Sequence, residues 1–189
     1  MIVKRMAVTG YKSHELGIFS EKDERVTYIK EAIRQRLVAF LEEGGEWVLL
    51  SCQPGVEFWT AEVVIELKQE YSVSLAILPP FEGVEERWPE HIQLAYQEIL
   101  SEADFFKAIY KGGYKGPFQF KAKDRFIVEH TDKALVLYDE ETPGTPKFFL
   151  EFARVADDYE VEWITPEDLQ EAVEDMQWSD PGTPEEDPH

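Results

Sequence analysis

Residues 48–62, VLLSCQPGVEFWTAE, decide the fold of this chain. A run of Val and Leu typical of a buried strand ends at Ser51, the pair Pro54-Gly55 follows, and a helix is predicted to begin at Val56. A strand that turns directly into a helix is the repeating unit of α/β proteins. Such a turn either only connects two elements, or its bare backbone holds a ligand, because Gly permits close approach and the start of a helix favours anions.

The same unit recurs along the chain. Near-continuous apolar strands that alternate with helices predict a parallel sheet covered on both faces, that is, an α/β, three-layer Rossmann-like domain with a mostly parallel sheet over residues 1–177. Residues 178–189 are acidic and Pro-rich, and we expect them to form a disordered tail. The expected strands are 2–9, 47–50, 73–78, 105–110, 134–138 and 161–164, and the expected helices are 26–40, 56–70, 89–100, 119–129, 146–155 and a short one after 165–168.

Composition narrows the functions that are open to the protein. The chain has 189 residues, with 39 acidic against 19 basic side chains, and this net charge of -20 repels nucleic acid and anionic membranes. Its single cysteine, Cys52, excludes an internal disulfide and a zinc site built on cysteines, and it suits a reducing compartment. No apolar run reaches the length of about 18 residues that a membrane span needs, so we expect a cytoplasmic protein. The four histidines lack the spacing of metal ligands, and we expect no metal site.

Four loops are expected at the carboxyl edge of the sheet, where α/β proteins bind ligands. They are VTGYKSHELGIF (8–19), SCQPGVEFW (51–59), LPPFEG (78–83) and YDEETPGTPKFF (138–149), and each combines Gly or Pro with polar groups. One such loop is more often only a turn, but four at one edge favour a binding site. The GxGxxG and Walker motifs are absent, which argues against a standard dehydrogenase or a P-loop NTPase.

Backbone amides are the first candidate ligands of an anion in these loops. Gly10 and Gly55 would allow the main chain to approach a phosphate, and Gly144 precedes another helix start at which the Thr145 hydroxyl could donate. Lys12 could neutralise the phosphate.

Glu57 is the most informative carboxylate. At the start of a helix it is stabilised by the helix dipole, which is sufficient reason for its presence; alternatively it accepts hydrogen bonds from ribose hydroxyls or orients a water molecule. Trp59 could form a wall of the pocket or belong to the core, and Cys52 is interpreted as a small packing residue.

Residues 111–125 run against the overall charge of the chain. Five basic side chains and one acidic one are interleaved with aromatic residues, so the segment is either an anion-facing lid or a solvated helix face. Arg125, at its end, is a second candidate to neutralise phosphate.

The segments AVTGYKSHELGIF, SCQPGVEFWTAE, PFQFKAKDRFIVE and LVLYDEETPGTPKF together resemble the YpsA family of the SLOG superfamily, which also contains DprA and the LOG nucleotide-cleaving enzymes. The resemblance covers residues 3–175 and implies a Rossmann-like fold with a pocket for a nucleotide such as ADP-ribose or an NAD-like ligand, and a link to bacterial cell division. The family motif resembles Ser-Gly-Gln-x-Gly-x-Glu-x-Trp, in which Cys52 takes the first Gly position and is expected to narrow the pocket. The LOG motif Pro-Gly-Gly-x-Gly-Thr-x-x-Glu is matched only by Pro54-Gly55 and a nearby acid.

We therefore expect a regulatory protein that binds a nucleotide or nucleotide derivative, with cell-division proteins as partners and neither nucleic acid nor membrane among them. The alternatives are a hydrolase that cleaves an N-glycosidic bond with Glu57 as its catalytic carboxylate, and an adaptor without a ligand. The candidate ligand-binding residues are Thr9, Gly10, Tyr11, Lys12, Ser51, Gln53, Gly55, Glu57, Trp59, Phe81, Arg125, Asp139, Gly144 and Thr145.

Overall fold

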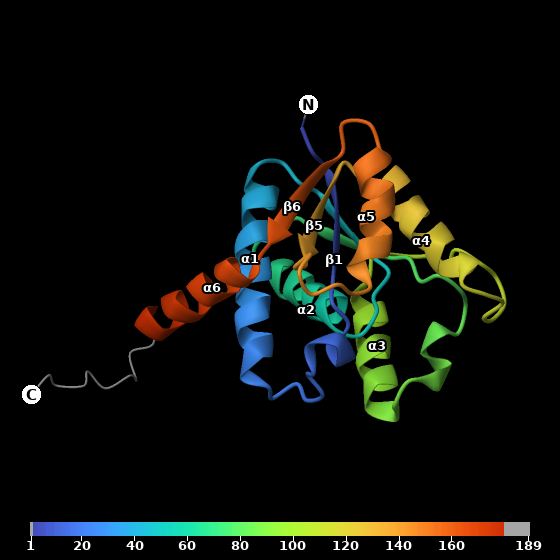
Figure 1. Ribbon diagram of the computed structural model, residues 1–189, viewed down its shortest axis with the longest axis horizontal. Helices are drawn as coiled ribbons and strands as arrows, with labels where there is room; N and C mark the ends of the chain where they lie inside the picture. The colour runs from blue at the N-terminus through green and yellow to red at the C-terminus, as the bar shows by residue number, and fades with distance from the viewer. Residues whose placement is uncertain (1, 180–189) are drawn as a thin grey trace, which may run out of the picture.

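The structure, a computed structural model, describes residues 2–179 and contains one sheet of six parallel strands (Figure 1). The strand order is β4-β3-β2-β1-β5-β6, and every neighbouring pair is parallel. This arrangement confirms the predicted α/β Rossmann-like fold. The strands are β1 (Arg5–Gly10), β2 (Trp47–Leu50), β3 (Ser74–Ile77), β4 (Phe105–Phe106), β5 (Lys133–Leu137) and β6 (Glu160–Ile164).

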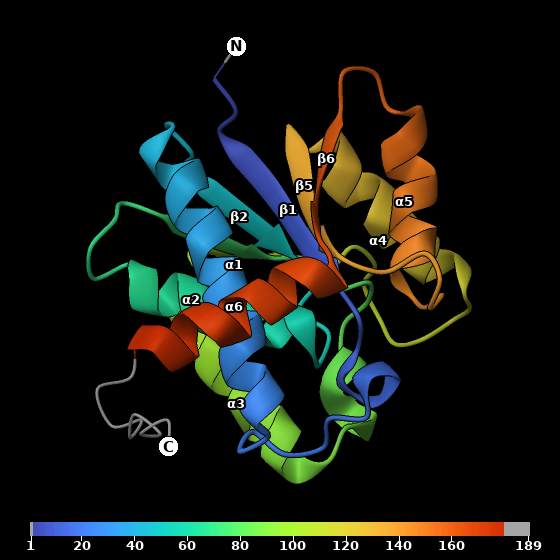
Figure 2. The same ribbon diagram turned by 60° about the vertical axis from the view of Figure 1, so that its left-hand side comes forward.

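Helices cover both faces of the sheet, as Figures 1 and 2 show. The chain moves outward from β1 to β4 and then returns to β5 and β6 on the other side of β1. Because parallel crossovers are right-handed, this reversal puts the two crossover helices before β5 and β6 on the opposite face, whereas the helix after β6 lies on the first face. Accordingly α1 packs on α2 and α6, α2 packs on α3, and α4 packs on α5. The helices are α1 (Glu24–Glu42), α2 (Val56–Leu67), α3 (Glu90–Glu102), α4 (Phe118–Glu129), α5 (Pro146–Val155) and α6 (Pro166–Ser179), with short 3-10 turns η1 (Ser13–Leu16) and η2 (Val84–Arg87).

The expected strand over 105–110 is wrong in length, since β4 ends at Phe106. Beyond it the chain still follows the end of β3, where the amides of Ile109 and Tyr110 donate to the carbonyls of Pro79 and Pro80 at 2.9 and 3.2 Å. Pro79 and Pro80 have no N–H to return these bonds, so the regular strand stops. Pairing resumes only at an isolated bridge between Phe81 and Tyr110, where the amide of Glu82 donates to the Tyr110 carbonyl at 3.2 Å.

The last helix differs from expectation at its end. Trp178 and Ser179, which we assigned to the tail, belong to α6, and the remaining expected tail, 180–189, lies outside the described residues. Within residues 2–179, no helix is both long and apolar enough to cross a membrane.

The direction of the chain reverses at β1, which lies between β2 and β5. The loops that follow β1 and β5 therefore leave in different directions and open a crevice at the carboxyl ends of these strands.

Candidate functional site

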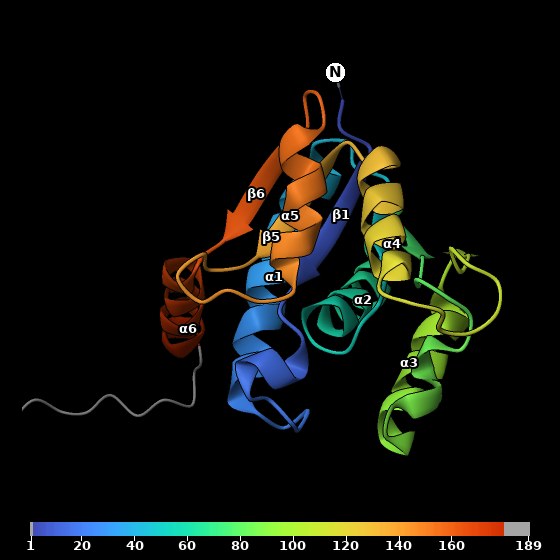
Figure 3. The same cartoon turned by 45° about the vertical axis from the view of Figure 1, so that its right-hand side comes forward.

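A cavity of about 310 Å³ occupies this crevice, a volume at the lower end of small-molecule sites. It lies where the first turns of α4 and α5 approach α2 and the end of β1, a convergence visible in Figure 3. The lining residues are Thr9, Gly10, Lys12, Gln53, Glu57, Pro117, Phe120, Lys121, Lys123, Asp124, Thr145, Pro146, Phe148 and Phe149. The sequence analysis named Thr9, Gly10, Lys12, Gln53, Glu57 and Thr145 among these.

Glu57 is buried, and its two carboxylate oxygens differ. Oε1 accepts hydrogen bonds from the amide and the hydroxyl of Ser51, at 2.8 and 2.9 Å, and from the amide of Cys52 at 3.1 Å. Oε2 has only a long contact of 3.5 Å from the Thr9 hydroxyl. One oxygen therefore fixes the turn between β2 and α2, and the other can accept a bond from a ligand.

Burial raises the pKa of the Glu57 carboxyl, although the nearby Lys123 ammonium and the hydrogen bonds from Ser51 and Cys52 act in the opposite direction. A carboxyl group with a raised pKa can hold a proton at a higher pH than an exposed glutamate can. Both the structural and the chemical interpretations of Glu57 thus have a basis in the geometry.

Lys123 and Asp124 form an ion pair in the cavity wall, with 2.6 Å between Nζ and Oδ1 and side chains that are each 10% exposed. Arg125, the candidate for neutralising phosphate that the sequence favours on this helix, is exposed and paired with Glu129 at 3.1 Å. A helix turns by 100° per residue, so Arg125 points away from the wall that Lys123 lines. The missed signal was a charged pair within the buried stripe of α4, between Phe120 and Ile127.

Gln53 has a buried amide nitrogen, Nε2, with no hydrogen-bond partner among residues 2–179. The residue is 8% exposed and lines the cavity. A buried donor without an acceptor costs about 1–3 kcal/mol, and a ligand with an acceptor oxygen would remove this cost.

The backbone of Gly55 is covered by the chain itself. Its φ of 124° suits glycine, and a Cβ there would lie 2.6 Å from the Tyr11 carbonyl and from the Ser13 amide. The amide of Val56, the first of α2, donates to the Tyr11 carbonyl at 3.1 Å. Gly10 is similarly covered, since its Cβ would lie 2.7 Å from the Val56 side chain. The Pro54-Gly55 turn therefore packs directly against the loop that follows β1. Gly55 is not part of the cavity lining, so its backbone is not free to approach a ligand there.

Glu15, which the sequence analysis missed, caps α5. Its carboxylate accepts from the Thr145 amide at 2.8 Å, from the Thr145 hydroxyl at 2.7 Å and from the Lys12 amide at 2.9 Å. Burial would raise the pKa of Glu15, but these donors outweigh it and leave the pKa lowered. Gly144 lies against the same carboxylate, so the α5 N-terminus already holds an anion from the chain. No local signal marks this pair, because the partners are 130 residues apart.

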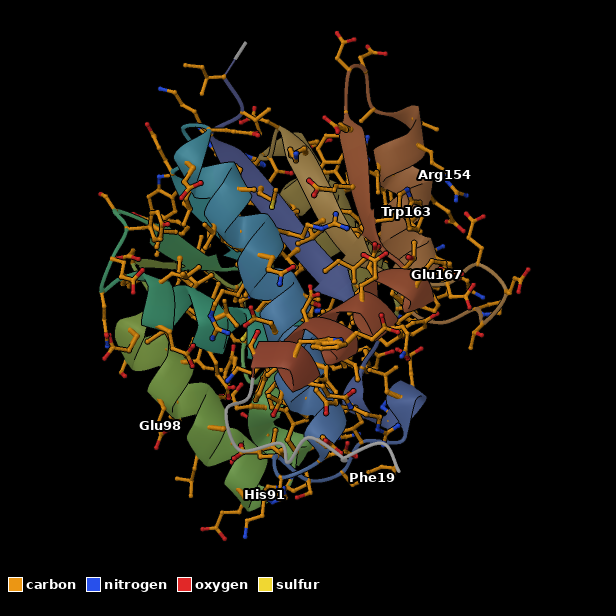
Figure 4. The ribbon with its side chains drawn as sticks, turned by 90° about the vertical axis from the view of Figure 1, so that its left-hand side faces the viewer. Phe19, His91, Glu98, Arg154, Trp163 and Glu167 are labelled. Atoms are coloured by element: carbon orange, nitrogen blue, oxygen red, sulfur yellow. The ribbon has the colours of Figure 1, made fainter. Side chains whose placement is uncertain are left out.

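Tyr11 and Asp139 join two loops outside the cavity. The Tyr11 hydroxyl accepts from the Asp139 amide at 2.9 Å and donates to the Thr142 carbonyl at 2.7 Å. Asp139 faces a second, more open hollow at the ends of β5 and β6. Trp163 and Glu167, labelled in Figure 4, line that hollow too and come from β6 and the start of α6.

The remaining candidates lie behind the cavity wall. Ser51 is buried and supports Glu57, Trp59 is buried in the core, and Phe81 packs on the cavity-lining Phe120 with 5.9 Å between ring centroids. Cys52 is the small packing residue that the sequence favours, and its fully buried side chain is not part of the cavity lining and does not narrow it. Its φ of 63° is a left-handed conformation, which glycine adopts most readily.

Comparison with known proteins agrees with the fold and places the chain in a family. The solved structure of DNA processing protein A from Helicobacter pylori, described by its single-stranded DNA binding mode, matches with a TM-score of 0.56 and 13% identity over 93% of this chain and 74% of that one. At this identity the similarity concerns the fold alone.

Sequence relatives are much closer. The UPF0398 protein of Oceanobacillus iheyensis is 49% identical over 180 residues, and UPF0398 proteins of Staphylococcus aureus strains are 44% identical over 183; each alignment covers 95% of this chain and 98% of the relative. The YpsA family model, described as the YspA SLOG family, matches residues 6–169. The chain belongs to the YpsA family of SLOG proteins.

Proposed function

We propose that this protein binds a nucleotide or nucleotide derivative in the cavity, with a ribose hydroxyl between Glu57 and Gln53. The observation that supports this most is a pair of groups in one buried wall: Nε2 of Gln53, a donor without a partner among residues 2–179, and Oε2 of Glu57, an acceptor whose only contact is the Thr9 hydroxyl at 3.5 Å. A hydroxyl both donates and accepts, so a sugar can satisfy the two groups at once. The Thr9 hydroxyl lies beside them as a further partner.

The apolar part of the cavity suits the rest of such a ligand. Phe120, Phe148 and Phe149 provide ring surfaces against which a base or a sugar face can pack. Membership of a SLOG family supports a nucleotide-related ligand, and the H. pylori neighbour is described by its binding of single-stranded DNA, a polymer of nucleotides. ADP-ribose and NAD-like molecules are the first ligands to test.

We extend the proposal to a regulatory role in the cytoplasm, in which the occupied cavity alters binding to cell-division proteins. This part rests on the family resemblance. A regulatory rather than catalytic role also agrees with the contacts of Glu57, because one oxygen of its carboxylate is already engaged in holding the turn between β2 and α2.

Thermal shift and calorimetry with adenosine, AMP, ADP, ADP-ribose and NAD test the binding. At least one of them should raise the melting temperature, and Gln53→Leu, which removes the unsatisfied donor, should weaken its binding about tenfold. The matched control is Arg125→Gln, which changes an exposed residue of α4 outside the cavity. An unchanged melting temperature with the whole panel contradicts the proposal.

The raised pKa of Glu57 favours a second candidate, an N-glycosidic hydrolase. In that reaction the Glu57 carboxyl gives its proton to the departing base as the C–N bond breaks, water adds to the anomeric carbon, and the proton that this water loses returns to the Glu57 carboxylate. Incubation with AMP or NAD should then release the free base, and Glu57→Gln should abolish the release. Release at an undiminished rate in the variant removes Glu57 from this role.

A further inference from the structure

Three lysines near the cavity lack the ion pairs that this chain could easily supply. Acidic residues outnumber basic ones 39 to 19, yet Lys12, Lys121 and Lys147 form no ion pair among residues 2–179; the charge of Lys12 acts on the Glu15 carboxylate only from beyond ion-pair distance. They come from three separate segments: the loop after β1, α4 and α5. Lys12 and Lys121 line the cavity, and Lys147 adjoins the lining residue Phe148.

Two of these ammonium groups lie over rings of the cavity wall. The Nζ of Lys12 is 5.9 Å from the centroid of Phe120, and that of Lys147 is 5.0 Å from the centroid of Phe148. Phe148 is 41% exposed, so its ring stands at the mouth of the cavity. The cation–π contacts hold both charges at this mouth and leave their N–H donors available to a ligand.

Inside the cavity, in contrast to its mouth, the buried side chains of the described lining residues include a carboxylate and no unpaired lysine. Glu57 is buried, and the buried charge of Lys123 is already paired with Asp124. A phosphate beside Glu57 would meet a carboxylate, whereas a phosphate beside the exposed Lys121 would meet an unpaired cation. An anionic ligand is therefore oriented with its neutral sugar inward and its phosphates outward.

The loop that leads into α4 carries two further lysines, although the Glu82 carboxylate accepts from its Gly112 amide at 2.9 Å. Lys111 and Lys115 are exposed on this loop. Gln119 holds it in place, since its fully buried side chain accepts from the Lys115 amide at 2.8 Å and donates to the Gly113 carbonyl at 3.2 Å. The loop offers further cations to a second phosphate.

We propose that Lys12, Lys121 and Lys147 form a phosphate-binding rim, and that the physiological ligand is a nucleotide with at least two phosphates that enters sugar first. The inference rests on the proposed nucleotide function and goes further by naming the substrate class and the residues that select it. In this proposal the rim selects ligands by their number of phosphates, and Glu57 and Gln53 recognise the sugar.

Calorimetry with adenosine, AMP and ADP tests the rim at low and high salt. ADP should bind about tenfold tighter than adenosine at low salt, and this gain should shrink at high salt because exposed charges are screened. The double variant Lys121→Gln/Lys147→Gln keeps Lys12 and should therefore remove most, but not all, of the gain in affinity of ADP over adenosine. Lys22→Gln, which removes another lysine without an ion pair in the described chain, is the control and should keep the whole gain.

The outcomes separate the two proposals. Adenosine and ADP binding equally to the natural chain, or a gain that persists undiminished in the double variant, overturns the rim and leaves the nucleotide function standing. Absence of binding by all three compounds overturns the rim, and absence of binding by ADP-ribose and NAD as well overturns the nucleotide function.

Discussion

The Glu57 carboxylate accepts both the amide and the hydroxyl of Ser51 at a single oxygen, 2.8 and 2.9 Å away. This contact ties the first turn of α2 to the end of β2, and the Cys52 amide adds a third donor. Glu57, the residue expected to bind a ligand, thus also stabilises the connection between β2 and α2.

Glu57→Ala should lower the free energy of unfolding by about 2–4 kcal/mol, because it leaves two buried amides and a hydroxyl without an acceptor. Urea unfolding measures this. Glu62→Ala, on the same helix, removes a partly exposed partner of Lys30 and should cost less than about 1 kcal/mol. Equal losses in the two variants would show that the contacts of Glu57 with Ser51 and Cys52 contribute nothing specific.

The pH dependence of stability should carry the signature of the raised Glu57 pKa. Above pH 4.5, the ordinary value, the unfolded chain has released this proton while the folded chain still holds it, so stability falls as pH rises toward the folded pKa. Glu57→Gln cannot ionise and should lack this decline. Urea unfolding of both proteins from pH 4 to 8 gives the comparison, and parallel curves would contradict the assignment.

Glu15 and Thr145 should be energetically coupled across 130 residues of sequence. Thr145→Val removes a hydroxyl that donates to the cap of α5 and should cost about 1 kcal/mol, and Glu15→Gln should cost a similar amount. Because the two changes break the same contact, the double variant should lose less than the sum. Thr142→Val, an exposed threonine in the same loop, serves as control. Additive losses would refute the coupling.

The same measurement, extended below pH 4, separates Glu15 from Glu57. The lowered pKa of Glu15 gives stability that is present above pH 4.5 and lost as pH falls through the folded pKa. Glu15→Gln should therefore flatten the acid side of the stability curve, opposite in direction to the effect of Glu57→Gln.

The fold followed from the sequence because buried parallel strands are continuous apolar runs, as in VLL of β2. Helix α5 was predicted from Pro146 to Val155, as observed, since proline suits a first helical position. The length of β4 did not follow, because it depends on the missing N–H groups of a neighbouring Pro79-Pro80 segment rather than on its own residues.

The sequence predicted the sheet edge at which the cavity lies, but only some of the residues that line it. The rule for parallel sheets placed it at the right edge, yet Gly55 and Gly144 face other parts of the chain there, which only the folded loops reveal. Lys123 lines the cavity and Arg125 does not, and that distinction depends on the rotation of α4. A helical wheel of α4 places Lys123 on the same face as the buried apolar residues, and a charged residue on that face is the signal that would have identified it.

The Lys123–Asp124 pair provides the last prediction, since it combines burial with charge. Asp124→Ala leaves a buried ammonium without its partner and should lower the free energy of unfolding by about 3–5 kcal/mol, whereas Lys123→Met/Asp124→Leu removes both charges and should cost much less. Chemical denaturation of the three proteins tests this order. If the single variant proves no less stable than the double, the pair is effectively solvated and the cavity wall is more open to water than its 10% exposure indicates.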